Sequence, residues 1–175
     1  ISLGLPEVKK GNIVTFGVPP TIPEANYGYL ELGEPKKNGS VKLKSFVEKP
    51  KVQTAKEMVN SGKYLWNAGI YLFRASDMIE AFRENQPSIL ESVRSALDDG
   101  KPDLGFWRLN PSSWSKIKSI SIDYAIMEKV SNIVAIPFSA GWSDLGQWNA
   151  IWKELNPDKN GVVEAGAATA INCKN

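Results

Sequence analysis

The segment from Val41 to Pro50 reads VKLKSFVEKP and predicts a strand that stops at a proline. Apolar and polar residues alternate along it, as expected for a half-buried strand. The last proline ends the strand because it has no N–H to donate to a neighbouring strand. One face would carry Val41, Leu43 and Val47, and the other Lys42, Lys44 and Phe46.

Segments on both sides of this strand alternate between strand-like and helix-like patterns. Short apolar runs predict further strands at 12–18, 27–32, 68–73 and 132–138. Apolar residues at helical spacing predict helices from 52 to a stop at Gly62, from a cap at Ser76, from Pro87, over 122–130, and from a cap at Ser143. The alternation indicates an α/β architecture with a mostly parallel or mixed sheet.

The composition of the 175 residues limits the classes of function. The net charge of +2 is too small to indicate a nucleic-acid surface, and no apolar run approaches the roughly 20 residues of a membrane span. The chain has no histidine, which excludes Ser-His-Asp, Cys-His and HExxH catalysis within it. Cys173 is its only cysteine, so no internal disulfide can form and a cytoplasmic setting is expected.

Glu48 and Lys49 follow the strand at 41–47 directly, at an end where open α/β sheets bind ligands. The carboxylate could accept hydrogen bonds from sugar hydroxyls, and the ammonium could neutralise a phosphate. On the residues alone, a solvated Glu–Lys pair of little energetic value is the more frequent interpretation.

Three residues near other strands are candidates of the same kind. Gly28 lies between two tyrosines, where a missing side chain would let a ligand or another backbone approach, although a bulge beside packed aromatic rings explains it as well. Asn67 offers a donor and an acceptor to a sugar hydroxyl, and Gly69 permits a close backbone approach. The alternative for both is an ordinary entry from a loop into a strand.

Asp144 is the candidate metal ligand. It lies just before a predicted helix, and Mg²⁺ usually takes one or two carboxylates together with substrate phosphates. A carboxylate in that position also stabilises a helix N-terminus without any metal.

Five segments in order and spacing resemble the GDP-mannose pyrophosphorylases, the mannose-1-phosphate guanylyltransferase family. They are YGY at 27–29, FVEKP at 46–50, WNAGIYLF at 66–73, SIDYAIMEK at 121–129 and GWSDLGQW at 141–148. The resemblance covers nearly the whole chain, and five segments in register make chance similarity improbable. It implies part of a Rossmann-like nucleotide-diphospho-sugar transferase fold, with three layers and a mixed, mostly parallel sheet.

The resemblance also implies a role for each candidate in the sugar-phosphate pocket. Gly28 would contact the sugar through its backbone, Glu48 would bind sugar hydroxyls, and Lys49 would bind the phosphate. Asn67 and Gly69 would complete the pocket around the sugar.

Two aspartates have more distant roles in this scheme, and part of the site has no counterpart here. Asp144 would be one of two aspartates that hold Mg²⁺, and Asp123 would brace the pocket without touching the substrate. The family's glycine-rich nucleotide loop and its second metal aspartate are not found in this sequence, which opens at Ile1. We therefore expect a fragment that is inactive alone, with residues 1–155 in the transferase domain. Residues 156–175 would form a linker and the start of a β-rich region.

The implied reaction joins mannose 1-phosphate to GTP and yields GDP-mannose and pyrophosphate, as in polysaccharide biosynthesis. These sugar and nucleotide compounds are the expected partners, without nucleic acid or membrane, and a homodimer is the expected assembly. A glucose-1-phosphate uridylyl- or thymidylyltransferase is the nearest alternative. A non-catalytic regulatory module that binds sugar phosphate is the second.

Overall fold

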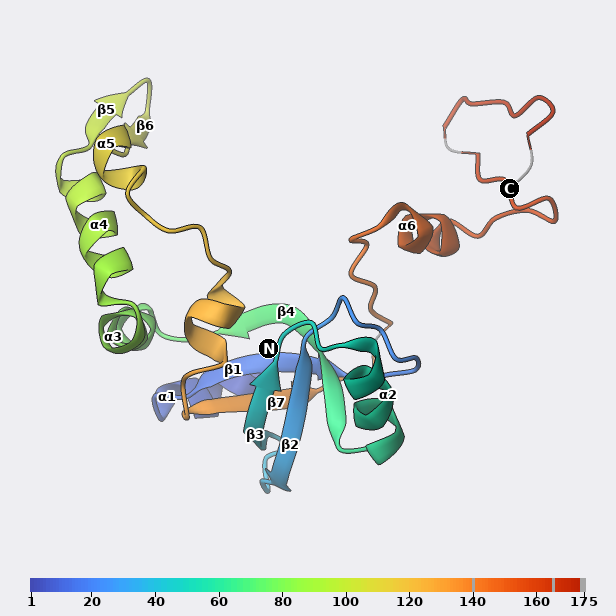
Figure 1. Cartoon of the computed structure of the whole chain (residues 1–175), viewed down its shortest axis with the longest axis horizontal. Helices are drawn as coiled ribbons and strands as arrows, with labels where there is room; N and C mark the ends of the chain where they lie inside the picture. Colours follow the sequence, from blue (N-terminus) through green and yellow to red (C-terminus); the bar gives the residue numbers. More distant parts are fainter. Residues whose placement is uncertain (140, 165, 174–175) are drawn as a thin grey trace. The chain divides into compact units, whose positions relative to one another are not determined.

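The computed structural model describes residues 1–139, 141–164 and 166–173. The chain divides into two compact units, Ile1–Ser139 and Ala140–Asn175 (Figure 1). Among the described helices, none has the length and apolar character needed to cross a bilayer.

The first unit is built on five strands that pair in a ring (Figure 1). Going round it, the strands are β1 (Ile13–Val18), β4 (Tyr64–Leu72), β2 (Tyr29–Pro35), β3 (Val41–Val47) and β7 (Ile133–Pro137), and β7 pairs with β1 again. Each strand thus has a partner on both sides.

The mixed sheet confirms the α/β expectation, but the expected predominance of parallel pairs is not what this chain shows. Among the described strands, β1 and β7 form the only parallel pair, while the other neighbours are antiparallel. The short turn between β2 and β3 can join only antiparallel strands, because a parallel crossover needs a dozen or more residues. The parallel partner β7 follows β4 after a long connection that holds several helices.

A β-bulge changes the faces of β3. Glu31 of β2 lies opposite Ser45, but Leu32 lies opposite Leu43, which leaves Lys44 as an extra residue in β3. The alternation therefore changes phase at this point. Phe46 joins the buried cluster that contains Leu43, instead of sharing an outer face with Lys42 and Lys44 as the simple alternation predicted.

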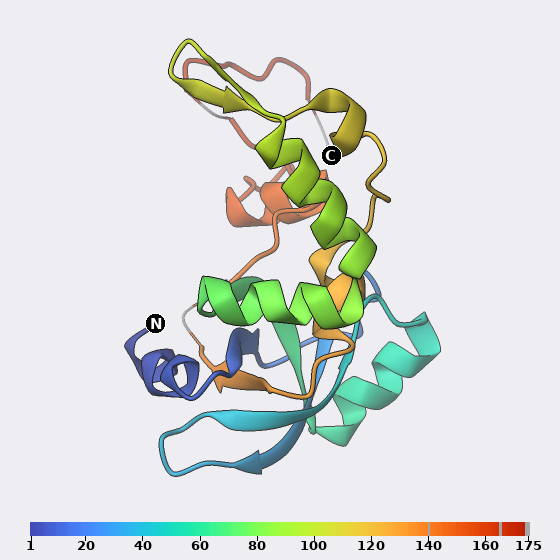
Figure 2. The ribbon, with the colours of Figure 1, turned by 90° about the vertical axis from the view of Figure 1, so that its left-hand side faces the viewer.

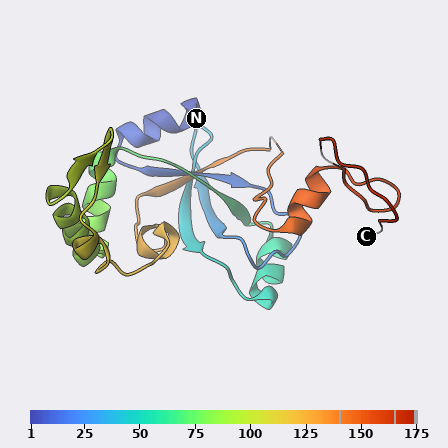
Figure 3. The same cartoon turned by 90° about the horizontal axis from the view of Figure 1, so that it is seen from above.

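Helices flank the strands of the first unit, and Figure 3 shows α3 and α4 at one end of the sheet and α2 at the other. The chain begins with a 3₁₀ turn (Ser2–Gly4) and α1 (Leu5–Lys9). The later helices are α2 (Val52–Ser61), α3 (Ala75–Asn85), α4 (Pro87–Asp98), α5 (Pro111–Trp114) and the π-helical turn η2 (Asp123–Met127). Gly62 ends α2 in the left-handed region and Pro87 begins α4, as predicted, whereas α3 has Arg74 and not Ser76 as its N-cap.

A small hairpin follows α4 and was not predicted. It consists of β5 (Lys101–Asp103) and β6 (Phe106–Arg108), and Figure 2 shows it projecting beyond the end of α4. Gly100 precedes the hairpin, and a Cβ there would lie 2.3 Å from the indole nitrogen of Trp107. The glycine therefore allows the hairpin to fold back on the helix.

A buried carboxylate fastens α1 to the turn between β2 and β3. Glu7 is fully buried, and its oxygens accept hydrogen bonds from Lys10, Asn12 and Asn38 at 2.9 Å and from Lys36 at 2.6 Å. The hydrogen bonds from Lys36 and Lys10 are the main reason why the pKa of the Glu7 carboxyl falls from 4.5 to about 2. These bonds stabilise the charged form that burial alone would disfavour.

The second unit contains α6 (Trp148–Glu154). Its N-cap is Gln147, so the helix begins later than the predicted cap at Ser143, and no residue of α6 is buried. The indole N–H of Trp152 donates to the carbonyl of Gly161 at 2.7 Å, which ties the helix to the segment that follows it.

Candidate functional site

The pairing of β2 with both β3 and β4 brings three predicted residues together. Gly28 precedes β2, Glu48 follows β3, and Asn67 lies within β4. The carbonyl of Gly28 accepts a hydrogen bond from the Asn67 backbone at 2.8 Å. A Cβ at Gly28 would lie 2.6 Å from Oε2 of Glu48 and 3.2 Å from Cβ of Asn67. The carboxylate therefore occupies space that only a glycine leaves open.

Glu48 is held in place at its backbone and is largely buried at its side chain, which is 11% exposed. Its N–H donates to Oε1 of Glu128 at 2.9 Å, and its carbonyl accepts from the hydroxyl of Tyr124 at 3.4 Å. Burial, and next the negative charge of Asp123, raise the pKa of the Glu48 carboxyl, and Lys49 opposes this shift. Such a carboxylate gains from any hydrogen-bond donor that a ligand brings.

Lys49 differs from its neighbour in exposure. Its side chain is 58% exposed, and its ammonium lies 3.8 Å from Oε1 of Glu48. The backbone of Lys49 has a φ of 48°, a left-handed conformation that is unfavourable for a residue with a side chain. Its N–H donates to the carbonyl of Tyr27 at 3.2 Å, which holds the turn. The pair is therefore not the fully solvated one that is common on surfaces.

Asn67 belongs to a chain of hydrogen bonds that crosses three elements. The hydroxyl of Thr15 in β1 donates to Oδ1 of Asn67 at 2.9 Å, and Nδ2 of Asn67 donates to the hydroxyl of Tyr71 at 2.9 Å. Tyr71 in turn donates to Oδ1 of Asp123, the first residue of the π-helical turn η2. Burial and the bond to Asp123 raise the pKa of the Tyr71 phenol.

Gly69 lies in the irregular stretch where β4 pairs with β1. Thr15 is opposite Tyr71 and Gly17 opposite Asn67, so β4 holds extra residues between these pairs. Gly69 has a φ of 70°, and a Cβ there would find nothing within 4 Å. The glycine is needed for backbone conformation, and not for close packing against a neighbouring group.

Asp144 lies in the second compact unit. Its side chain is exposed, and the missing Cβ of Gly146 leaves room for it, because an atom there would lie 2.6 Å from Oδ2 of Asp144. Within the described parts of the chain, no three His, Cys, Asp or Glu side chains gather closely enough to hold a metal ion. A metal at Asp144 would therefore depend on ligands from the substrate, water or other protein residues.

Sequence reasoning missed four residues of this region. Tyr71, Tyr124 and Glu128 lie in segments that carried the resemblance, and Thr15 lies in the strand predicted at 12–18, but nothing in the one-dimensional pattern singled out these four residues. Their roles arise from strand pairing and from the π-helical turn.

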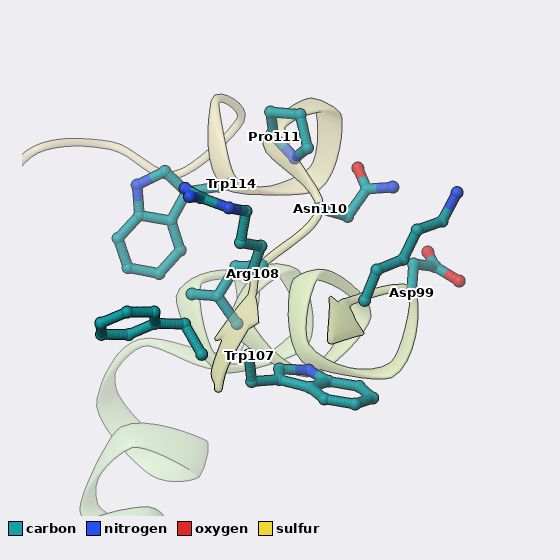
Figure 4. A pocket seen from close by; sticks show the side chains of 9 residues that line it. Asp99, Trp107, Arg108, Asn110, Pro111 and Trp114 are labelled. Atoms are coloured by element: carbon teal, nitrogen blue, oxygen red, sulfur yellow. The ribbon is translucent and has the colours of Figure 1, made fainter. Parts of the chain in front are cut away.

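A separate pocket of about 930 Å³ lies around the β5–β6 hairpin (Figure 4). It is lined by Asp99, Lys101, Phe106, Trp107, Arg108, Leu109, Asn110, Pro111 and Trp114. Figure 4 shows Trp114 and Arg108 on one side and Trp107 on another. None of the predicted site residues lines it.

Residues 6–161 match the family model described as Nucleotidyl transferase. The chain belongs to this family. Among curated relatives, the xanthan biosynthesis protein XanB of Xanthomonas campestris pv. campestris (strain B100) is 38% identical over the whole chain. A mannose-1-phosphate guanylyltransferase of Sinorhizobium fredii is 41% identical over 95% of it. The chain spans only 37% and 32% of the lengths of these two relatives.

Solved structures agree with this membership of the nucleotidyl transferase family. A Thermus thermophilus protein described as mannose-1-phosphate geranyltransferase matches with a TM-score of 0.74 and 31% identity, over 91% of this chain and 44% of that one. A Helicobacter pylori protein described as mannose-6-phosphate isomerase matches with a TM-score of 0.72 and 29% identity, over 81% of this chain and 56% of that one. The nucleotidyltransferase-like α/β fold is therefore shared by both.

Proposed function

We propose that this chain forms the sugar-phosphate side of a mannose-1-phosphate guanylyltransferase, within a Rossmann-like three-layer transferase fold. The observation that carries the proposal is the Glu48 carboxylate, packed against Gly28 and Asn67 with the exposed Lys49 ammonium beside it. Acceptors for hydroxyls next to a cation are what a sugar phosphate requires. The guanylyltransferase named among the relatives supports this choice of substrate.

Each predicted residue has a task in this proposal. Glu48 accepts hydrogen bonds from sugar hydroxyls, and its raised pKa reflects a carboxylate that lacks full solvation. Lys49 neutralises the phosphate, for which its exposed ammonium is free to move. Asn67 hydrogen-bonds a sugar hydroxyl through the amide N–H and the oxygen lone pair that Tyr71 and Thr15 leave unused. Gly28 and Gly69 offer backbone groups to the sugar.

The transfer itself needs no covalent intermediate with the protein. A phosphate oxygen of mannose 1-phosphate attacks the α-phosphorus of GTP in line, and the bond from that phosphorus to the β-phosphate oxygen breaks. GDP-mannose forms and pyrophosphate leaves. Two anions must be brought together, so positioning and charge neutralisation carry the catalysis. The absence of histidine from the sequence is no obstacle to such chemistry.

Mg²⁺ is the proposed cofactor, and Asp144 would hold it. A single exposed carboxylate fits an ion that takes one or two carboxylates plus phosphates and water. When bound, Mg²⁺ neutralises the charge that develops on the transferring phosphoryl group. The contribution of this chain is to present the Asp144 carboxylate, against which Gly146 leaves space.

Substrate profiling separates this proposal from its alternatives. The natural polypeptide that carries this sequence is incubated with mannose 1-phosphate or glucose 1-phosphate and with GTP, UTP or dTTP, and pyrophosphate release is measured. We expect the highest kcat/KM for mannose 1-phosphate with GTP. A preference for glucose 1-phosphate with UTP or dTTP would establish the uridylyl- or thymidylyltransferase instead. Binding of mannose 1-phosphate without any pyrophosphate release would identify a regulatory module.

The Helicobacter pylori relative adds one further reaction to check, because its description names an isomerase. Interconversion of mannose 6-phosphate and fructose 6-phosphate is therefore assayed with the same preparation. We expect none from residues of this chain, since the proposed pocket places the Lys49 ammonium against a phosphate on C1 of the sugar, whereas an aldose–ketose isomerisation requires that C1 carry no phosphate. Loss of isomerase activity in Lys49→Ala would contradict that expectation.

A further inference from the structure

We propose that Thr15 and Tyr71 are positioning residues that fix which way the Asn67 side-chain amide points, with Asp123 setting the direction. The inference rests on the proposed function in one respect, namely that Asn67 contacts the sugar. The hydrogen bonds themselves belong to the protein without substrate.

The direction of the chain of hydrogen bonds follows from its carboxylate end. An ionised carboxylate can only accept, so the Tyr71 hydroxyl must give its single proton to Asp123. The phenol oxygen is then left with lone pairs alone for Asn67. It can be approached only by the amide nitrogen, and Nδ2 of Asn67 does lie 2.9 Å away.

The other end of the chain completes the same orientation. With Nδ2 turned to Tyr71, Oδ1 of Asn67 faces the Thr15 hydroxyl, which donates to it at 2.9 Å. Thr15 is fully buried and Asn67 is 9% exposed, so water cannot readily replace either partner. The raised pKa of Tyr71 keeps its proton in place at any ordinary pH.

The consequence for the sugar concerns donors and acceptors. An amide has two N–H groups and two lone pairs on its oxygen, and the hydrogen bonds to Tyr71 and Thr15 use one of each. A rotation by half a turn about the Cβ–Cγ bond would exchange the nitrogen and the oxygen, with little change in shape. A sugar hydroxyl would then meet the wrong group. Thr15 and Tyr71 thus act through Asn67 and need no contact with the sugar.

The hydrogen-bonded residues come from three elements that are brought together only in the folded protein. Thr15 comes from β1, Asn67 and Tyr71 from β4, and Asp123 from the π-helical turn. The irregular pairing of β1 with β4 lies between Thr15 and Gly17, beside the bonds in question. Such irregularities in strands and π-helical turns are often found at functional sites.

The test combines NMR on the protein without ligand with steady-state kinetics on the natural polypeptide. Three variants interrupt or reverse the series of hydrogen bonds. Tyr71→Phe removes both hydrogen bonds of the phenol, and Thr15→Val removes the donor to Oδ1 of Asn67. Asp123→Asn adds an N–H donor at a position where the carboxylate could only accept. Thr15→Ser keeps the hydroxyl. Ser45→Ala, which removes a hydroxyl bonded to Glu31 elsewhere in the sheet, is the matched control.

In the NMR arm we expect one pair of Asn67 side-chain amide signals in the wild type, in Thr15→Ser and in Ser45→Ala. Tyr71→Phe, Thr15→Val and Asp123→Asn should shift or split this pair and speed the hydrogen exchange of the amide. Unchanged Asn67 signals in a folded Thr15→Val and a folded Asp123→Asn would overturn the inference, whatever the protein catalyses. If Tyr71→Phe fails to fold, Thr15→Val and Asp123→Asn still test whether the hydrogen bonds fix the Asn67 amide.

In the kinetic arm we expect the three disruptive variants to raise the KM for mannose 1-phosphate about 3- to 10-fold, as one lost hydrogen bond would. The KM for GTP should stay within about twofold, a separation that general destabilisation would not produce. Equal increases in both constants would overturn the positioning role. Absent turnover of mannose 1-phosphate by the wild type would instead refute the proposed function and leave the NMR result standing.

Discussion

Glu48 and Lys49 are adjacent in the chain but face different surroundings. The carboxylate is packed beside Gly28, whereas the ammonium extends into solvent. The left-handed backbone at Lys49 turns the chain between them. Strained backbone of this kind is found repeatedly where ligands are held. The two charges can thus serve different parts of one sugar phosphate.

Replacing the ammonium should affect one substrate only. In the natural polypeptide, Lys49→Ala should raise the KM for mannose 1-phosphate about 10- to 100-fold, because a hydrogen bond to a charged group is worth about 1.5–3 kcal/mol. The KM for GTP should change little. The control is Lys56→Ala, which removes an exposed lysine from α2. If the dependence on mannose 1-phosphate is unchanged, Lys49 does not bind the phosphate.

Adding one methyl group at Gly28 should disturb the pocket more than the fold. The new Cβ would lie 2.6 Å from Oε2 of Glu48, the flexible end of a side chain, so the carboxylate would move while the backbone stayed. Calorimetry should show that Gly28→Ala binds mannose 1-phosphate about 10-fold more weakly. A second change, Glu48→Asp, shortens the clashing side chain. The double variant should therefore lose less binding free energy for mannose 1-phosphate than the sum of the losses in the two single variants. Strict additivity would argue against this contact.

Changing the proposed metal ligand should give a different kinetic signature. Asp144→Asn should lower kcat, and a higher concentration of Mg²⁺ should restore part of it, because a weaker site is refilled by mass action. Asp98→Asn, which alters an exposed carboxylate of α4, should leave the Mg²⁺ dependence unchanged. A reduced kcat that no amount of Mg²⁺ improves would remove Asp144 from the metal site.

Elements are held together by polar contacts as well as by the apolar core, and α1 is the clearest case. Glu7 joins this helix to the β2–β3 turn through Lys36 and Asn38. Its folded-state pKa of about 2 lies below the ordinary 4.5. The carboxylate therefore stabilises the fold fully above about pH 4.5, and this contribution is lost as the pH falls from there towards 2.

The corresponding variant should lose stability chiefly at neutral pH. Glu7→Gln should lower the free energy of unfolding by about 1.5–3 kcal/mol at pH 7, because the lysines lose a charged acceptor. The difference from wild type should shrink as the pH falls below 4.5. Denaturant titrations at a series of pH values measure this, with the exposed Glu91→Gln as control. A difference that does not depend on pH would mean that charge plays no part.

The sequence predicted those elements whose position depends on residue types within the element itself. Three predicted features are confirmed: the strand Val41–Val47, which depends on alternating apolar and polar residues and on Pro50, the stop at Gly62, and the start at Pro87. The hairpin at 101–108 was missed because its strands of three residues are too short for a periodic signal. The bulge at Lys44 depends on the neighbouring strand, which the sequence of β3 does not describe.

The candidate site divides in the same way. Gly28, Glu48 and Asn67 could be chosen from residue type and from the resemblance, and the fold brings them together. Their mutual contacts could not be predicted, because they depend on β2 lying between β3 and β4. The same holds for Thr15, whose bond to Asn67 spans β1 and β4.

At the scale of the whole molecule, the proposed sugar-phosphate residues and the proposed metal ligand belong to different compact units. Ending the chain at Ser139 should therefore leave a unit that melts cooperatively and binds mannose 1-phosphate within about threefold of the 175-residue chain. Calorimetry on the two chains tests this. Loss of binding in a folded truncated chain would mean that the pocket requires the second unit.

The ring of strands also governs when the protein can fold during its synthesis. Strand β1 leaves the ribosome long before its parallel partner β7, which ends only at Pro137. At about 5–20 residues per second, the earlier strand waits on the order of ten seconds for the later one. During that interval its apolar residues lack a partner on one side, so nascent chains should depend on chaperones until β7 emerges.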